Sequence, residues 1–169
     1  MDFDLCIRRL ERDATVITGL VNGVPDEQMR WKPSADDWSL LEVINHLYDE
    51  EREDFRTRLD LILHQPGATW PPNDPEGWVV ERRYNERDPQ ESLEDFLQER
   101  TRSIRWLQGL ESPDWTRRGS HPSGFELSGG DMLASWVAHD MLHIRQLAEL
   151  HHQWLIAADQ ADVRYAGDW

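Results

Sequence analysis

The chain has 169 residues, 38% of them hydrophobic, which fits one globular domain spanning residues 1–169. Its formal net charge of −15 opposes contact with phosphate backbones and anionic lipids, which argues against nucleic acid and membranes as partners. Cys6 is the single cysteine, and this excludes an intrachain disulfide and a zinc site built from several thiolates.

Two helices are predicted in the first part of the chain. The first begins near Phe3, presents apolar residues at three- and four-residue spacing, and stops at residues 22–23 (Asn-Gly). The second begins with a capping box, in which the side chains of Ser39 and Glu42 each accept a hydrogen bond from the other's backbone N–H. We expect the second helix to end near residues 64–67.

Two more helices are predicted in the second part. The third begins at the Asp-Pro pair of residues 88–89, where the aspartate is a suitable N-cap, and it ends near Gly109. The fourth should begin near Ser128 or Asp131 and run to roughly His152 or a little beyond.

Four amphipathic helices, without strand-like alternation of comparable length, predict an all-α four-helix bundle. The long connection at residues 65–89, between the second and third helices, is rich in Trp and Pro. Loops of this length inside compact domains are usually functional or disordered, and the tryptophans favour an ordered loop. The connection at residues 115–130 is a second candidate for lining a pocket mouth, where His121 could gate a site.

Three histidines fall on helix faces that are otherwise apolar. His139 and His143 are four residues apart, so both rings project from one side of the fourth helix, where two imidazoles can bind one ion. His46 lies at the edge of the apolar arc of the second helix and is the candidate third ligand. An isolated histidine is more often a hydrogen-bonded residue at the core boundary, but the coincidence of three favours a shared site.

Three further ionisable residues take core-facing positions. Glu50 follows His46 by one turn, Asp140 lies on the buried arc of the fourth helix, and Arg100 lies on the apolar stripe of the third, where an unpaired guanidinium would be very costly. We assign Glu50 or Asp140 as proton acceptor or histidine orienter, and Arg100 as a clamp on an anionic substrate group. The alternatives are a structural Arg100–Glu50 ion pair and an arginine partner for Asp140. Apart from Glu50, the acidic run at residues 49–54 is expected to be a solvated helix face.

Residues 38–47 (WSLLEVINHL) and 136–147 (WVAHDMLHIRQL) resemble the DinB-like superfamily of metal-binding four-helix bundles. This superfamily includes bacillithiol and mycothiol S-transferases, and the resemblance spans roughly residues 5–150. It implies a single divalent metal ion bound by one histidine of the second helix and an HxxxH pair of the last long helix. The ligands that it implies are His46, His139 and His143.

Three neutral imidazoles leave a divalent ion with open positions, as in catalytic rather than closed structural sites. Relatives with assigned activity use a low-molecular-weight thiol, so the resemblance implies a metal-dependent transferase that joins a thiol cosubstrate to a small electrophile. The alternatives are a metal-dependent hydrolase and a noncatalytic metal- or ligand-binding module. Zinc or nickel is the expected ion, although iron and manganese also accept imidazole.

The sequence also carries expectations about the surroundings of the protein. No apolar leader-like run is present near the beginning, and no run reaches the ~20 apolar residues of a membrane span, so a cytoplasmic protein is expected. The expected partner is a small-molecule substrate, and a homodimer that buries one face of the bundle would be usual for a small domain.

Overall fold

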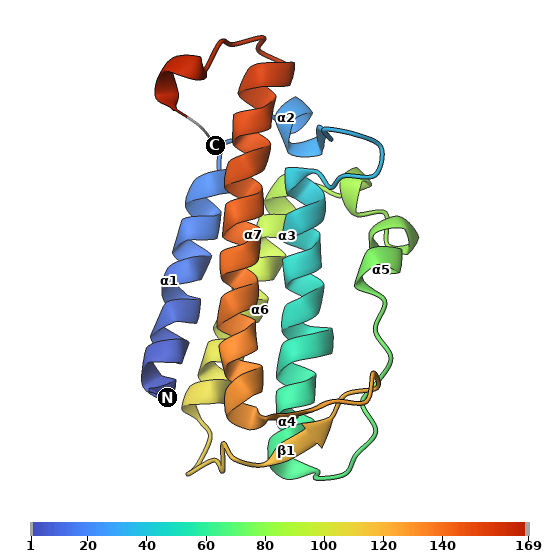
Figure 1. The fold of residues 1–169 in the computed structure, drawn as a ribbon, viewed down its shortest axis with the longest axis vertical. Helices are drawn as coiled ribbons and strands as arrows, with labels where there is room; N and C mark the ends of the chain where they lie inside the picture. Colours follow the sequence, from blue (N-terminus) through green and yellow to red (C-terminus); the bar gives the residue numbers. More distant parts are fainter. Residues whose placement is uncertain (1, 168–169) are drawn as a thin grey trace.

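The computed structural model describes residues 2–167 and consists of four long rods (Figure 1). The rods are α1 (Phe3–Val21), a continuous helix made of α3 (Leu40–Asp49), η1 (Glu50–Phe55) and α4 (Arg56–His64), then α6 (Pro89–Gln108) and α7 (Gly129–Ala157). Helices α1 and α3 each pack against both α6 and α7. The predicted four-helix bundle is therefore confirmed.

Local hydrogen bonds fix where the rods begin. The capping box of Ser39 and Glu42 is present at the start of α3. The Asp88 side chain caps α6 by accepting a hydrogen bond from a backbone N–H of its first turn. A second capping box joins Ser128, the N-cap of α7, to Asp131, so both residues that the sequence offered as the start of this helix take part in it.

Some short elements lie outside the prediction. Helix α2 (Asp26–Arg30) follows α1, and strand β1 (Arg118–Ser120) pairs antiparallel with β2 (Glu126–Ser128). Strands of three residues are too short to leave an alternating pattern in the sequence. Helix α7 continues to Ala157, beyond the expected end near His152, because no Gly or Pro interrupts the intervening residues.

The long connection between α4 and α6 contains helix α5 (Pro75–Glu81) and the 3₁₀ turn η2 (Tyr84–Glu86), and it runs alongside α3 in Figure 1. Tyr84 donates its hydroxyl hydrogen bond to Asp49 at the end of α3, and Arg82 pairs with the same carboxylate at 2.6 Å. A small apolar cluster of this connection packs against Trp38. The connection is therefore joined to the helix that carries His46.

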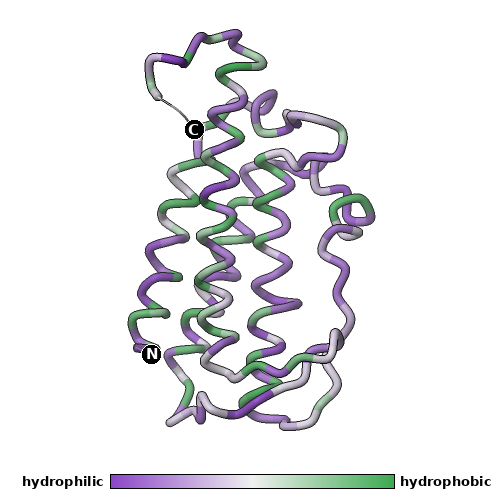
Figure 2. Tube along the Cα trace, viewed as in Figure 1, coloured by the Kyte–Doolittle hydropathy of each residue, from purple (hydrophilic) through white to green (hydrophobic). Residues whose placement is uncertain are grey.

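The core has one apolar cluster at each end of the bundle. The lower cluster in Figure 1 is built around Leu10, Leu59 and Trp136, and the upper one around Ile17 and Leu47. Buried polar side chains separate the two clusters. Figure 2 shows hydrophobic and hydrophilic residues mixed along each rod, and no described helix is long and apolar enough to cross a membrane.

Candidate metal centre

Three imidazole rings from two helices meet at the contact between α3 and α7. His46 belongs to α3, and His139 and His143 belong to α7. The Nε2 atom of His139 lies 3.2 Å from Nε2 of His46 and 3.1 Å from Nε2 of His143. The ligand atoms of the three rings all lie within 4.8 Å of one another, which suits a single ion with metal–nitrogen distances of ~2 Å.

The two helices give the centre one closed and one accessible side. His46 is 4% exposed, because its neighbours Val43 and Leu47 pack in the upper apolar cluster. His139 and His143 lie one turn apart on α7 and are only half-buried. The two α7 histidines therefore keep part of their surface exposed, while the α3 histidine is closed off from solvent.

Burial keeps the rings neutral. The loss of solvation, reinforced by the neighbouring His143, lowers the pKa of His46 to about 3 and that of His139 to about 2. Burial also lowers the pKa of His143, and a hydrogen bond to Gln146 opposes this shift. Neutral imidazole is the form that binds metal ions, so burial prepares all three rings for coordination.

The hydrogen-bond pattern fits a bound cation. Nδ1 of His143 lies 2.7 Å from Oε1 of Gln146, so Nδ1 carries the hydrogen and Nε2 presents a lone pair to the other rings. His139 Nε2 faces the Nε2 atoms of both His46 and His143, and a single N–H could satisfy only one of them. A divalent ion would satisfy all three lone pairs at once.

Aromatic side chains enclose the centre. The ring of Trp38 lies 4.8 Å from His46 and 6.4 Å from His143, parallel to the latter. Phe55 lies 5.0 Å from His139 and stacks on Trp136 at 5.5 Å. These rings provide an apolar wall against which an uncharged part of a substrate can pack.

Glu50 lies in η1, a π-helical turn that continues α3, and such turns are frequent at functional sites. It is 5% exposed, and its Oε1 atom has no hydrogen-bond partner among the described residues. Burial, together with the carboxylate of Asp54, raises the pKa of Glu50 to about 8, although Arg58 opposes the shift. Arg58 is 2.6 Å from Asp54, so that carboxylate has a cation while Glu50 has none of its own.

Arg100 and Asp140 are joined in a buried network. The guanidinium contacts Asp140 through both Nη atoms at 2.7 and 2.8 Å, contacts Glu51 through Nε and Nη2, and donates to the carbonyl of Leu10. Glu51 also accepts a hydrogen bond from Trp136 at 2.7 Å. All five N–H groups of Arg100 are thus used by the protein, which leaves none for the anionic substrate group that the sequence assigned to it. Burial raises the pKa of Asp140 to about 6 in spite of this arginine.

The expectation of a solvated acidic face at residues 49–54 is wrong. Asp49 and Glu51 are at most 1% exposed, and Asp54 is 8% exposed. Each of them pairs with an arginine. The carboxylates face inward because Arg100 of α6, Arg58 of α4 and Arg82 of the long connection reach them there, and an unpaired buried carboxylate would be costly.

Sequence reasoning therefore missed Glu51, Asp49 and Asp54 as buried groups. A usable signal existed, since Arg100 at a core position demands an anion and the acidic run supplies more carboxylates than its own helix can neutralise. His121, the proposed gate, stacks on Phe125 at 4.5 Å and contacts Trp70 edge-on at 5.6 Å, at the tip of the β1–β2 hairpin. It has no described contact with the three histidines.

The fold and the centre together define a class: a four-helix bundle with a candidate three-histidine site between two of its helices. Within that class, residues 9–147 match the DinB superfamily, and the chain belongs to this family. The confirmed resemblance covers both segments that carry the histidines.

One solved structure is similar over nearly the whole chain. It is described as "YfiT from Bacillus subtilis is a probable metal-dependent hydrolase with an unusual four-helix bundle topology". The two proteins share 23% sequence identity, the match covers 89% of this chain and 86% of YfiT, and the TM-score is 0.80. This likeness shows a shared fold. No curated protein matches the sequence.

Proposed function

We propose that the protein is a metal-dependent enzyme that transfers a low-molecular-weight thiol to a small electrophile. The observation that carries the proposal is the convergence of three neutral Nε2 atoms, two of them on accessible rings, at the α3–α7 contact. His46, His139 and His143 would hold one divalent ion, with zinc or nickel as our first choice. Such an ion would lower the pKa of a thiol that binds it.

Glu50 is the residue that we assign to proton transfer. Burial raises its pKa to about 8, so its carboxylate is a stronger base than that of an ordinary glutamate and can take the proton of a thiol whose own pKa the ion would lower. The thiol S–H bond breaks and Glu50 takes the proton, while the sulfur forms a bond to the electrophilic carbon. The leaving group departs with the bonding electrons, or, in an addition, the proton from Glu50 goes to the product.

Arg100 and Asp140 are assigned a positioning role. Asp140 is adjacent to His139 on α7, and the Arg100 network ties it to α6 and to Glu51 of η1. The network thereby fixes the rotation of α7, and with it the direction in which the two α7 histidines point. Trp38 and Phe55 would pack against the apolar part of the electrophile.

Metal-dependent hydrolysis is the second candidate. It is favoured by the likeness to YfiT, which is described as a probable metal-dependent hydrolase. The same centre serves this chemistry with water in place of the thiol, and Glu50 would again accept the proton.

Elemental analysis of the untagged protein tests the proposal first. We expect about one equivalent of a divalent metal per chain, as a three-histidine site implies. The variant His143→Ala should stay folded and lower the metal affinity more than about 100-fold. Mutation of residues that only hydrogen-bond to metal ligands already lowers metal affinity by about 10- to 100-fold, and loss of a ligand itself should cost more. The control is His64→Ala, which removes a surface histidine paired with Asp60 on α4.

A panel of thiols with an activated aryl halide then separates the candidate reactions. Turnover that needs a thiol, and that disappears in His143→Ala but not in His64→Ala, supports the transferase. Ester or amide cleavage without any thiol would favour hydrolysis. Metal-free protein, or metal-loaded protein with neither activity, would overturn the enzymatic proposal and leave a binding module.

A further inference from the structure

His143 is the one candidate ligand whose outer ring nitrogen has a hydrogen-bond partner among the described residues. Its Nδ1 atom lies 2.7 Å from Oε1 of Gln146, three residues further along α7. Nδ1 of His46 is buried without a partner, and the hydrogen-bond contacts described for His139 involve only its Nε2. A protein group outside the centre therefore selects the tautomer of His143 alone.

The hydrogen bond to Gln146 determines which nitrogen of His143 can bind an ion. A neutral imidazole whose Nδ1–H donates to an amide oxygen presents a lone pair at Nε2, and this atom faces Nε2 of His139 at 3.1 Å. In the other tautomer, Nε2 of His143 would carry the hydrogen and donate it to His139. That arrangement would block one ligand atom and occupy the lone pair of a second. The metal-free centre thus has an alternative state that cannot bind an ion, and the hydrogen bond to Gln146 opposes it.

The surroundings of Gln146 favour the amide orientation that this hydrogen bond requires. An amide can turn either end towards a neighbour, and only its oxygen can accept the hydrogen of His143. Gln146 also lines a small cavity of about 120 Å³ together with the carboxylates Asp37 and Glu149, and no Lys, Arg or His is among the residues that line it. Carboxylates attract the N–H groups of the amide, which leaves its oxygen on the side of His143.

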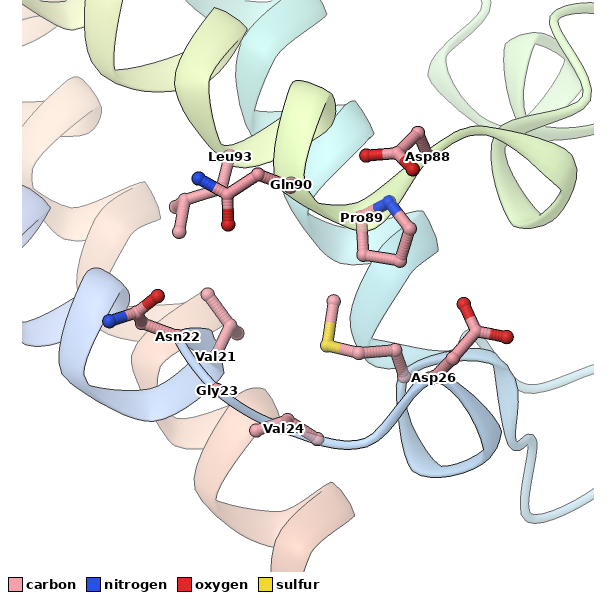
Figure 3. A pocket seen from close by; sticks show the side chains of 10 residues that line it. Val21, Asn22, Gly23, Val24, Asp26, Asp88, Pro89, Gln90 and Leu93 are labelled. Atoms are coloured by element: carbon pink, nitrogen blue, oxygen red, sulfur yellow. The ribbon is translucent and has the colours of Figure 1, made fainter.

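A glutamine in another cavity has no such connection to a histidine (Figure 3). Gln90 lines a cavity of about 270 Å³ between the α1–α2 turn and the start of α6. Its amide N–H donates to Glu94 on the same helix at 2.7 Å, and no histidine is among the residues that line this cavity. Gln90 is therefore a matched control for Gln146.

We propose that Gln146 is a positioning residue of the metal centre, which holds the ring of His143 with its Nε2 lone pair turned towards the ion. The inference rests on the metal-binding part of the proposed function and does not depend on whether a thiol or water reacts there. A carboxylate at this place would raise the basicity of the ring further, whereas the neutral amide orients the ring without adding a negative charge. Gln146 thus favours binding of the ion and leaves its positive charge available to a bound substrate.

The first experiment measures the tautomer of His143 in the metal-free protein by NMR. The two ring nitrogens have different chemical shifts according to which one carries the hydrogen, and the signals of His143 are assigned by their loss in His143→Ala. We expect the hydrogen on Nδ1 in the natural chain and mainly on Nε2 in Gln146→Leu. Gln146→Glu, whose carboxylate can only accept, should keep the hydrogen on Nδ1. Gln90→Leu should match the natural chain.

The second experiment measures the Kd for cobalt(II) by competition with a chelator. In Gln146→Leu the Kd should rise about 10- to 100-fold, the usual effect of removing a group that orients a metal ligand. Gln146→Glu should bind cobalt at least as tightly as the natural chain, because a carboxylate partner raises the basicity of the ring. Gln90→Leu should leave the Kd unchanged.

The outcomes separate this inference from the proposed function. An unchanged tautomer or an unchanged cobalt Kd in Gln146→Leu overturns the positioning role. Equal effects of Gln146→Leu and Gln146→Glu overturn it as well, since the two variants differ in the hydrogen-bond acceptor. A natural chain that carries the hydrogen on Nδ1 of His143 but binds no cobalt overturns the metal-dependent function, and with it the action of Gln146 on an ion.

Discussion

Glu50 and Glu51 are consecutive in the sequence and both buried, yet their surroundings differ completely. Glu51 is 1% exposed and receives hydrogen bonds from Arg100 and Trp136. Glu50 is 5% exposed, has an unpartnered oxygen, and has a pKa raised to about 8. Successive residues of a helix point in directions about 100° apart, so the Glu51 carboxylate meets Arg100 and Trp136, while the Glu50 carboxylate meets that of Asp54. Glu51 is held by donors that stabilise the fold, and Glu50 is the group that we propose for proton transfer.

The largest effect should come from the partners of Glu51. Arg100→Leu leaves the carboxylates of Glu51 and Asp140 buried without their cation, and we expect it to lower the free energy of unfolding by about 3–5 kcal/mol. Urea denaturation measures this loss. Arg105→Leu on the exposed face of α6 is the matched control and should change stability by less than about 0.5 kcal/mol. Equal effects of the two variants would show that the network adds nothing.

Replacing Glu50 should stabilise the metal-free protein at high pH, whereas replacing Arg100 should destabilise it. Its folded-state pKa of about 8 exceeds the ordinary value of 4.5, so the folded state retains a proton that the unfolded chain loses. Stability of the natural chain therefore falls as pH rises from 4.5 towards 8, and Glu50→Gln removes this contribution. Between pH 6 and 9 the variant should gain on the order of 2 kcal/mol relative to the natural chain.

Urea denaturation at both pH values measures the Glu50 effect. Glu111→Gln, which removes an exposed carboxylate, serves as the control, and its stability should follow the natural chain across the same range. If the free energies of unfolding of Glu50→Gln and of the natural chain change by the same amount from pH 6 to pH 9, the pKa of Glu50 is not raised in the folded protein.

The smallest effect concerns a single hydrogen bond. Trp136→Phe keeps an aromatic ring against Phe55 but removes the N–H that donates to Glu51. We expect the lost hydrogen bond and the smaller ring to lower the free energy of unfolding by about 1 kcal/mol. Metal content should be unchanged, because Arg100 still holds Glu51. A loss of metal in this variant would mean that the hydrogen bond from Trp136 to Glu51 also helps to position the three histidines.

Short-range patterns made much of this structure predictable. The four-residue spacing of His139 and His143 determines their common direction on α7 whatever else the chain does. The capping box at Ser39 and the cap at Asp88 involve residues within one turn, so the sequence alone locates the starts of α3 and α6. The position of His46 beside Val43, three residues earlier on the same side of the helix, then follows from the helical repeat.

The burial of the acidic residues of η1 and of the end of α3 could not be predicted, because it depends on partners that are distant in the sequence. Glu51 is buried because Arg100, 49 residues away, reaches it from α6. Asp49 is buried because Arg82 and Tyr84 reach it from the long connection. No periodicity within a helix reports such pairings, and acidic residues in a row normally indicate a solvated face. The pairing of Arg100 with two carboxylates of the protein cannot be inferred from the sequence for the same reason.

The π-helical turn η1 has a consequence for how this protein can vary. It lies between His46, on α3, and the apolar side chains of α4, such as Leu59. A π-turn holds one residue more than the α-helical segment that covers the same rotation. Deleting one residue here would therefore restore regular winding and leave His46 and Leu59 in nearly the same relative direction. What the deletion would change is the placement of the carboxylates between them, so the turn can be lost without loss of the metal ligand or of the lower core, but not without moving Glu50 or Glu51.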